Sequence, residues 1–348
     1  MKDIDAAIKW YEDNRPLYES LARKVEDIVK ENLEQRSIQY HSVTSRGKSL
    51  ESFTNKARSE KYSDPVNEIK DMAGIRVIVY LESDVKKVAD IIEKLFDVDK
   101  DNSLDQAQLL GSDRFGYRSV HYMAKFDKRR CELPEYKIYE NSPFEIQIRS
   151  LLQHAWAEIE HDRNYKFSGK LPTELERRFY LVAGMLESAD HEFVSIAEEI
   201  DKYKDVVIDE IKRDDLNISI NTVSLQEYLS AKFERLIEEG LLRKDFGDDA
   251  KLVVEELKLF GILRLYELDR IIPGDFQDNI RSILKLQLHP KLNFTSLIRN
   301  VLIINDAKRY FEVSWRNNWH FMKKSHKKLL NKYNVDVVYV RKHVGLNI

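Results

Sequence analysis

"FEIQIRS", residues 144–150, decides the fold, because apolar and polar side chains alternate along it. A period of two is typical of a β-strand, whose successive side chains point to opposite faces of a sheet. The face directed into the core is expected to hold Phe144, Ile146 and Ile148. The other face is expected to display Glu145, Gln147 and Arg149. This strand therefore predicts a sheet with a polar face inside a folded domain.

"GYRSVHY", residues 116–122, continues to residue 126 with the same alternation. Its core face would hold Val120, Tyr122, Ala124 and Phe126. Its polar face would hold Tyr117, Ser119, His121 and Met123. If the two strands are neighbours, an aromatic ring, a histidine, a carboxylate, an amide and a guanidinium share one surface. A solvated face, which antiparallel sheets commonly have, is the alternative explanation for either strand alone.

The elements around these strands follow from their periodicity. Residues 4–35 carry a helical apolar stripe, residues 37–43 alternate weakly as a strand, and residues 50–57 are spaced as a helix. "GIRVIVYL", residues 74–81, is a β-branched run typical of a buried strand, and an amphipathic helix follows it through Leu95. Residues 97–116 are polar and weakly patterned, so we expect a long loop beside a site.

The rest of the chain is predicted to be helical. Residues 171–204 read as a long helix pair, and residues 224–330 look mostly helical. We therefore predict an α+β fold, in which a small mixed sheet flanked by helices precedes a mostly α-helical domain. The expected division is a first domain over residues 1–170, a helical connector over 171–215 and a regulatory C-terminal domain over 216–348.

Composition narrows the class of protein. The 348 residues, 43% hydrophobic and 34% charged, suffice for two domains with ordinary cores. No apolar run resembles a secretory signal or a membrane span, which predicts a cytoplasmic protein without a membrane partner. Cys131 is the only cysteine, which excludes an intrachain disulfide and a thiolate-rich zinc site. Residues 190–210 hold eight acidic and two basic residues, whereas residues 308–343 hold ten basic and two acidic ones.

A basic segment, "SRGKSLESFTNKARSEK" (residues 45–61), suits a polyphosphate. Lys48, Ser52 and Lys56 recur every four residues and so share one helical face. A solvated basic helix is the alternative explanation. Asp71 comes just before the buried strand and Glu145 lies on another strand, and Mg²⁺ prefers one or two carboxylates with phosphate oxygens. The pair therefore predicts a magnesium site.

Taken together, these motifs resemble a known family. "DMAGIRV" (71–77), "GYRSVHY", "EIQIRS" and "QHAWAEIEHDRNYK" (153–166) occur in the order and spacing of the synthetase domain of RelA/SpoT family alarmone synthetases, especially the small, single-function members. The resemblance covers residues 20–170. It implies a nucleotidyltransferase-like fold and a GTP diphosphokinase that transfers the β,γ-pyrophosphate of ATP to the 3′-hydroxyl of GDP or GTP, giving (p)ppGpp.

The resemblance also implies roles for individual residues. Arg46 and Arg76 would sandwich the ATP adenine, and its phosphates would contact Lys48, Ser52 and Lys56. Asp71 and Glu145 would hold Mg²⁺, with Glu145 accepting the proton of the 3′-hydroxyl. The acceptor would be bound by Tyr117, His121, Gln147 and Glu160.

One departure from the family leaves the acceptor open. Small alarmone synthetases usually have "PKxNGY" before the acceptor tyrosine, whereas this chain has "SDRFGY", with Asp113 in place of the lysine that reaches the acceptor's 5′-phosphates. The 3′ end of tRNA is therefore an alternative acceptor, and the basic, aromatic stretch at residues 309–333 could hold RNA or simply pack as a helix. An inactive nucleotide-binding module is a third alternative, against which Asp71 and Glu145 argue. A homo-oligomer and a regulatory protein partner remain open.

Overall fold

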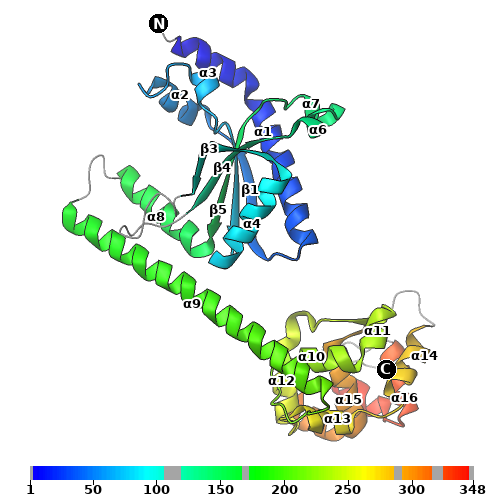
Figure 1. Ribbon diagram of the computed structural model, residues 1–348. Coiled ribbons are helices and arrows are strands. Elements are labelled where there is room, and N and C mark those ends of the chain that lie inside the picture. Colours follow the sequence, from blue (N-terminus) through cyan, green and yellow to red (C-terminus); the bar gives the residue numbers. More distant parts are fainter. Residues whose placement is uncertain (1–2, 106–118, 167–171, 286–291, 316–323, 345–348) are drawn as a thin grey trace. The chain divides into compact units, whose positions relative to one another are not determined.

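The computed structural model describes residues 3–105, 119–166, 172–285, 292–315 and 324–344 (Figure 1). Contacts divide the chain into two compact units, a first unit of Met1–Ala197 and a second unit of Glu198–Ile348. Each unit has its own hydrophobic core. The domain limits predicted from the sequence remain predictions, because the contact boundary lies inside one long helix and marks no functional division.

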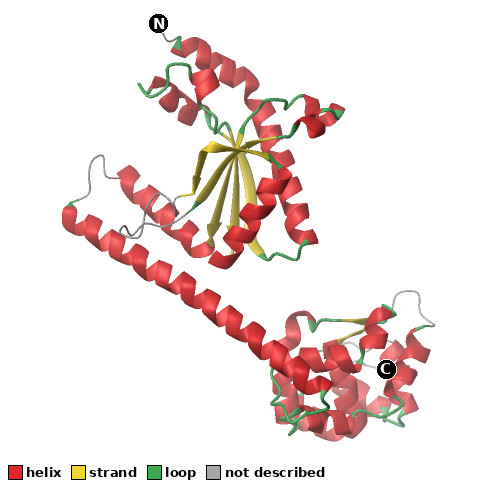
Figure 2. Cartoon of the chain, viewed as in Figure 1, coloured by secondary structure: helices red, strands yellow, loops and turns green. Residues whose placement is uncertain are grey.

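The first unit is built on a five-stranded mixed sheet (Figure 2). Its strands are β1 (Tyr40–Gly47), β2 (Ala73–Val79), β3 (Asp97–Asp105), β4 (Val120–Lys125) and β5 (Phe144–Ser150). They are ordered β1-β2-β5-β4-β3, and only β2 and β5 run parallel to each other. The α+β class with a small mixed sheet is therefore confirmed, and the two strands whose alternation predicted it are neighbours.

The sheet has one apolar and one polar face. The register aligns Gln147 of β5 with Arg76 of β2 and with His121 of β4, and Glu145 with Met123. Since aligned residues point to the same side, the polar side chains of three strands share one face. The apolar face of β5 is fully buried at Phe144, Ile146 and Ile148.

Two helices cover the apolar face, α1 (Ile4–Gln35) and α4 (Glu82–Leu95) (Figure 1). Both carry the stripe of an amphipathic helix. In α1 the buried stripe includes Leu21, Val25, Val29 and Leu33. This packing leaves the opposite, polar face of the sheet for the site.

Shorter helices connect the strands. They are α2 (Leu50–Arg58), α3 (Pro65–Glu68), α6 (Lys128–Cys131) and α7 (Pro134–Lys137), whereas α8 (Leu151–Lys166) follows the last strand, β5. Ser49 caps α2, because its side chain accepts a hydrogen bond from the backbone N–H of Ser52. The cap fixes where α2 begins beside the end of β1.

The predicted loop over residues 97–116 is wrong in its first part, because Asp97–Asp105 forms β3. This strand lies at the edge of the sheet and pairs with β4 alone. An edge strand buries less side-chain surface, so "DVDKDNSLD" lacks the apolar alternation that reveals a central strand. Residues 106–116 lie outside the described residues.

The predicted helix pair after residue 171 is also wrong. Thr173–Lys212 forms a single 40-residue helix, α9. The segment contains no proline, and its one glycine, Gly184, costs only about 1 kcal/mol in a helix interior. Nothing in the sequence of α9 therefore requires a turn.

The second unit is mostly helical, as predicted. Its helices are α10 (Thr222–Lys232), α11 (Glu234–Glu238), α12 (Ala250–Leu259), α13 (Leu265–Ile271), α14 (Phe276–Leu284), α15 (Phe294–Arg309), α16 (Lys324–Lys332) and α17 (Val337–His343). A 3-10 turn lies at Gly247–Asp249, a π-helical turn at Tyr310–Ser314, and two short parallel strands at β6 (Leu242–Arg243) and β7 (Leu292–Asn293). In the basic stretch, Tyr310 and Phe311 are buried, so both aromatic rings pack in the core.

Within the described ranges, no helix combines the length and the apolar composition that a membrane crossing requires.

Candidate active site

A pocket of about 230 Å³ opens on the polar face of the first unit, at β1, β2, β5 and the start of α2. Its polar lining includes seven residues that the sequence singled out: Arg46, Lys48, Ser52, Asp71, Arg76, Glu145 and Gln147. Two more contact this group, since Lys56 reaches Asp71 and His121 reaches Glu145. Residues separated by up to about a hundred positions thus meet at one place, while their individual roles stay predictions.

The backbone brings Lys48 to Asp71. The N–H of Lys48 donates to the carbonyl of Met72 at 2.8 Å, which continues the pairing of β1 and β2 by one residue. Gly47 allows β1 to approach α1, because a Cβ there would lie 2.5 Å from Cγ of Glu19. Ser49 then starts α2, so Lys56 comes to Asp71 from two turns along that helix.

Asp71 is held by two lysines. Its Oδ2 accepts hydrogen bonds from Nζ of Lys48 at 2.6 Å and from Nζ of Lys56 at 2.7 Å. Burial alone would raise the pKa of Asp71, but the two lysines outweigh it and hold the pKa below its ordinary value. Burial lowers the pKa of Lys48 despite this contact. For the more exposed Lys56, burial would also lower the pKa, but Asp71 outweighs it and raises the pKa above its ordinary value. Asp71 is therefore an ionised carboxylate.

Glu145 is ionised as well. Its Oε2 accepts a hydrogen bond from the Gln147 amide at 2.9 Å, and its Oε1 lies 3.4 Å from Nδ1 of His121. Burial would raise the pKa of Glu145, but the contacts with His121 and then Gln147 lower it below its ordinary value. A carboxylate in this state accepts a proton or binds a cation.

The two predicted stacking arginines come from neighbouring strands. Arg46 is aligned with Gly74, and Arg76 with Thr44, so the arginines are diagonal neighbours on one face. Diagonal positions lie about 7–8 Å apart, which is about twice the contact distance of two stacked planes. Arg76 Nη1 also donates to Oε1 of Glu158 on α8 at 2.8 Å. Glu158 thus orients one wall of the pocket.

Arg149 extends the polar face beyond the predicted site. Its Nη2 lies 3.4 Å from Nε2 of His121, and its Nε is buried without a hydrogen-bond partner in the described part of the chain. Burial, and then the charge of Arg76, lowers the pKa of Arg149. The alternation in "FEIQIRS" predicts that Arg149 lies on the polar face of the sheet. No motif in the sequence assigns a role to it.

Tyr11 on α1 holds the backbone of the site in place. The sequence analysis did not identify this residue. Its hydroxyl donates to the carbonyl of Lys48 at 2.7 Å, and its ring stacks on Phe53 of α2 at 4.3 Å between centroids. Burial raises the pKa of Tyr11 to about 12, so the hydroxyl stays a donor at neutral pH. Among the apolar residues of α1, nothing distinguished Tyr11 as a positioning residue.

Among the residues predicted to bind the acceptor, Gln147 lines the pocket, whereas His121 contacts Glu145 without lining it. Glu160 on α8 is exposed and does not line it, although Glu158, two residues earlier, does reach the site through Arg76. Tyr117 and Asp113 lie outside the described residues. The part that each of these residues plays in binding the acceptor stays a prediction.

The donor set suits magnesium. Asp71 and Glu145 are ionised and line the same pocket, and two carboxylates with phosphate oxygens and water are a usual Mg²⁺ environment. Within the described ranges, no group of three or more His, Cys, Asp or Glu side chains could hold a metal ion. A cation here would accordingly depend on a bound phosphate for its remaining ligands.

Part of this chain is similar to known proteins. Residues 45–170 match the family model described as "Region found in RelA / SpoT proteins". The GTP pyrophosphokinase YjbM of Bacillus subtilis (strain 168) is 30% identical over 163 residues, which span 45% of this chain and 72% of that protein. The GTP pyrophosphokinase YwaC of the same organism is 29% identical over 161 residues, spanning 45% and 73%.

A solved structure also matches. The small alarmone synthetase 1 from Bacillus subtilis is 27% identical, with a TM-score of 0.46. The match covers 56% of this chain and 98% of that one.

Proposed function

The chain belongs to the RelA/SpoT family, and from that premise we propose that it is a GTP pyrophosphokinase. It transfers the β,γ-pyrophosphate of ATP to the 3′-hydroxyl of GDP or GTP. Its similarity to two proteins named GTP pyrophosphokinases supports this reaction. The observation that carries the proposal is the meeting of Asp71 and Glu145, two ionised carboxylates, in one pocket with Lys48.

ATP is the donor in this proposal. Arg46 and Arg76 stack on its adenine, which the diagonal spacing of the two arginines supports. Lys48, Ser52 and Lys56 bind its phosphates. Both lysines also contact Asp71, so they place the phosphates of ATP next to the cation that Asp71 would hold. Asp71 and Glu145 would hold Mg²⁺, which when bound neutralises charge on the phosphate oxygens.

The acceptor hydroxyl attacks the β-phosphorus of ATP. A bond forms between the ribose 3′-oxygen and this phosphorus, the bond from the phosphorus to the α,β-bridging oxygen breaks, and AMP leaves. The proton of the hydroxyl passes to Glu145, whose ionised state supports its role as the base. His121 and Gln147 hold Glu145 and orient it toward the acceptor. The chain's contribution is alignment and charge neutralisation.

The test is a transfer assay with γ-labelled ATP and Mg²⁺, in which GDP, GTP and deacylated tRNA are offered separately. Label in a guanosine product is the expected result, and chelation of the metal with EDTA should abolish it. Label on tRNA alone would overturn the proposed acceptor. Label on none of the three would overturn the activity.

A further inference from the structure

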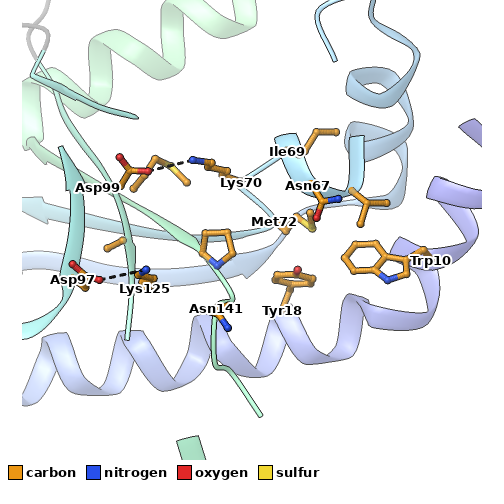
Figure 3. Close-up of a pocket in the computed structure, with 14 residues that line it drawn as sticks. Trp10, Tyr18, Asn67, Ile69, Lys70, Met72, Asp97, Asp99, Lys125 and Asn141 are labelled. Atoms are coloured by element: carbon orange, nitrogen blue, oxygen red, sulfur yellow. Dashed lines mark hydrogen bonds and ion pairs between the residues drawn. The ribbon is translucent and has the colours of Figure 1, made fainter. Parts of the chain in front are cut away.

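Figure 3 shows a second and larger cavity of the first unit, with a volume of about 480 Å³. It is formed by α1, α3, the segment Ile69–Met72, and strands β3 and β4. Its size is in the range of small-molecule sites. Neither carboxylate of the reaction pair lines it, so it is a separate compartment.

One side of the cavity is aromatic and apolar. Trp10 and Tyr18 of α1 contact each other edge to face, with ring centroids 6.4 Å apart. Ile69 and Met72, both almost completely buried, continue this surface, and Met123 adds to it from β4. Such a wall binds an aliphatic or aromatic side chain.

The side away from Trp10 is charged, and both signs are present (Figure 3). Nζ of Lys70 lies 3.2 Å from Oδ2 of Asp99, and Nζ of Lys125 lies 3.5 Å from Oδ2 of Asp97. Two lysines and two aspartates balance, so the lining charges sum to zero. In the candidate active site, by contrast, Arg46, Lys48 and Arg76 outnumber the two acids, which suits a polyphosphate.

We propose that this cavity binds a free α-amino acid with an apolar side chain. Such a ligand is neutral overall, carries a carboxylate and an ammonium next to each other, and presents an apolar group on the remaining side. The carboxylate contacts Lys70 or Lys125, the ammonium contacts Asp97 or Asp99, and the side chain lies against Trp10 and Tyr18. A nucleotide fits poorly, because its phosphates would face both aspartates.

Binding requires an exchange of ion pairs, which costs little. The side chains of Lys70 and Asp99 are 38% and 39% exposed, and those of Lys125 and Asp97 are 49% and 58% exposed. Ion pairs this exposed contribute little to stability, because solvent screens them. A zwitterion gives each separated lysine and aspartate a new partner, so no charge is left unpaired.

The cavity shares a segment with the candidate active site. Ile69, Lys70 and Met72 line the cavity, while Asp71 between them lines the other pocket and contacts Lys48. A ligand that moves Lys70 therefore changes the position of Asp71. The bound amino acid therefore regulates pyrophosphate transfer. This regulation, unlike the binding itself, rests on the proposed function.

Binding is tested by isothermal titration calorimetry of the full chain with L-leucine and L-phenylalanine. Two derivatives separate a free amino acid from the end of a peptide. N-acetyl-L-phenylalanine lacks the ammonium, and L-phenylalanine amide lacks the carboxylate. We expect saturable binding of at least one amino acid and, for L-phenylalanine, affinities about tenfold lower for both derivatives, since each loses a charged contact. No binding of either amino acid, or equal binding of one derivative, would overturn the proposal.

Variants localise the ligand. Asp99→Asn and Trp10→Leu should each weaken binding about tenfold or more. Asp101→Asn, an exposed aspartate on the same strand, is the matched control and should bind normally. Circular dichroism checks that each variant is folded. If both cavity variants are folded and bind like the control, the cavity is not the site.

A final arm separates this inference from the proposed function. Glu145→Gln should bind the amino acid like the unmodified chain, because Glu145 does not line the cavity. Binding that survives a failed transfer assay supports the site without the activity. In a chain that is active, saturating amino acid should change the transfer rate, and an unchanged rate would refute the coupling through Asp71.

Discussion

The two units of the protein each contain a cluster of opposite charges, and the two clusters are built differently. In the first unit, Lys48 and Lys56 both contact Asp71. The side chain of Asp71 is 21% exposed and lines a pocket. In the second unit, Arg299 of α15 holds Glu256 of α12, with side chains only 9% and 1% exposed. The first cluster can exchange partners with a ligand, whereas the second can only stabilise the fold.

The buried cluster leaves little to exchange. Nε and Nη2 of Arg299 both donate to Glu256, the closest contact being 2.7 Å. Tyr310 donates to the same carboxylate at 3.1 Å, and Ser314 in the π-helical turn donates to the Glu256 carbonyl. Nη1 of Arg299 reaches a more exposed partner, Oδ2 of Asp249, at 3.2 Å. Charge by itself therefore does not mark a functional site, but charge that lines a cavity does.

The largest effect is expected at Glu145. In Glu145→Gln, the carboxylate that accepts the proton and binds the cation is lost, so kcat should fall about 10³-fold with the fold preserved. The measurement is transfer from γ-labelled ATP at saturating substrates. Glu135→Gln, an exposed acid of the same unit, should keep full activity. A fully active Glu145→Gln variant would refute the assignment of the base.

A change in the buried cluster of Arg299 and Glu256 should lower the stability of the second unit. Glu256→Gln removes the more buried of two acids that pair with Arg299, and breaking a buried pair typically costs about 3 kcal/mol. Thermal unfolding should begin at lower temperature, and hydrogen exchange should speed up in peptides from α12 and α15. Glu255→Gln, exposed on the same helix, is the matched control. Equal stability of both variants would remove the distinction between the two clusters.

A smaller effect is expected at Lys56, which belongs to the cluster of Lys48, Lys56 and Asp71 in the first unit. Lys56→Met removes one phosphate contact, so the KM for ATP should rise about tenfold, while Lys48 still binds Asp71. Initial rates at varied ATP concentration measure it, with Lys61→Met as the control. Because the contact is partly exposed, added salt should narrow the difference. An unchanged KM would mean that Lys56 serves only to hold Asp71.

The sequence predicted the polar face of the sheet because a central strand exposes its two faces through strict alternation. Glu145, Gln147 and Arg149 follow directly from the pattern of "FEIQIRS". The same reasoning failed at β3, where an edge strand pairs on one side and needs no apolar period. Alternation thus reveals burial on one face, and only indirectly reveals pairing.

The periodicity of the sequence could not predict the contacts between different elements that complete the site. Arg76 meets Glu158 across 82 positions, and Tyr11 supports the backbone of Lys48 from another helix. Such pairs depend on how the elements pack, which a single sequence does not encode locally. The larger cavity has the same origin, since α1, α3, β3 and β4 each contribute only a few residues to it.

The smallest effect concerns pH and a third charged group, Asp269 in the second unit. Its Oδ1 accepts hydrogen bonds from Tyr228 at 2.5 Å and Lys232 at 2.6 Å. Burial would raise the pKa of Asp269, but Lys232 and Tyr228 lower it below its ordinary value. A carboxyl with a lowered folded pKa stabilises the protein above its unfolded pKa, about 3.9, and this contribution is lost as the pH falls through the folded pKa.

Asp269→Asn should therefore melt below the unmodified chain at pH 7, and the gap should close as the pH falls below about 4. Calorimetric melting of both proteins at several pH values measures it. Asp278→Asn, an exposed aspartate of the same unit, should show no such gap. The side chain of Asp269 is partly exposed, as that of Asp71 is. Like Glu256, it contacts both a basic side chain and a tyrosine hydroxyl. A gap that persists at low pH would mean that its hydrogen bonds, rather than its charge, stabilise the second unit.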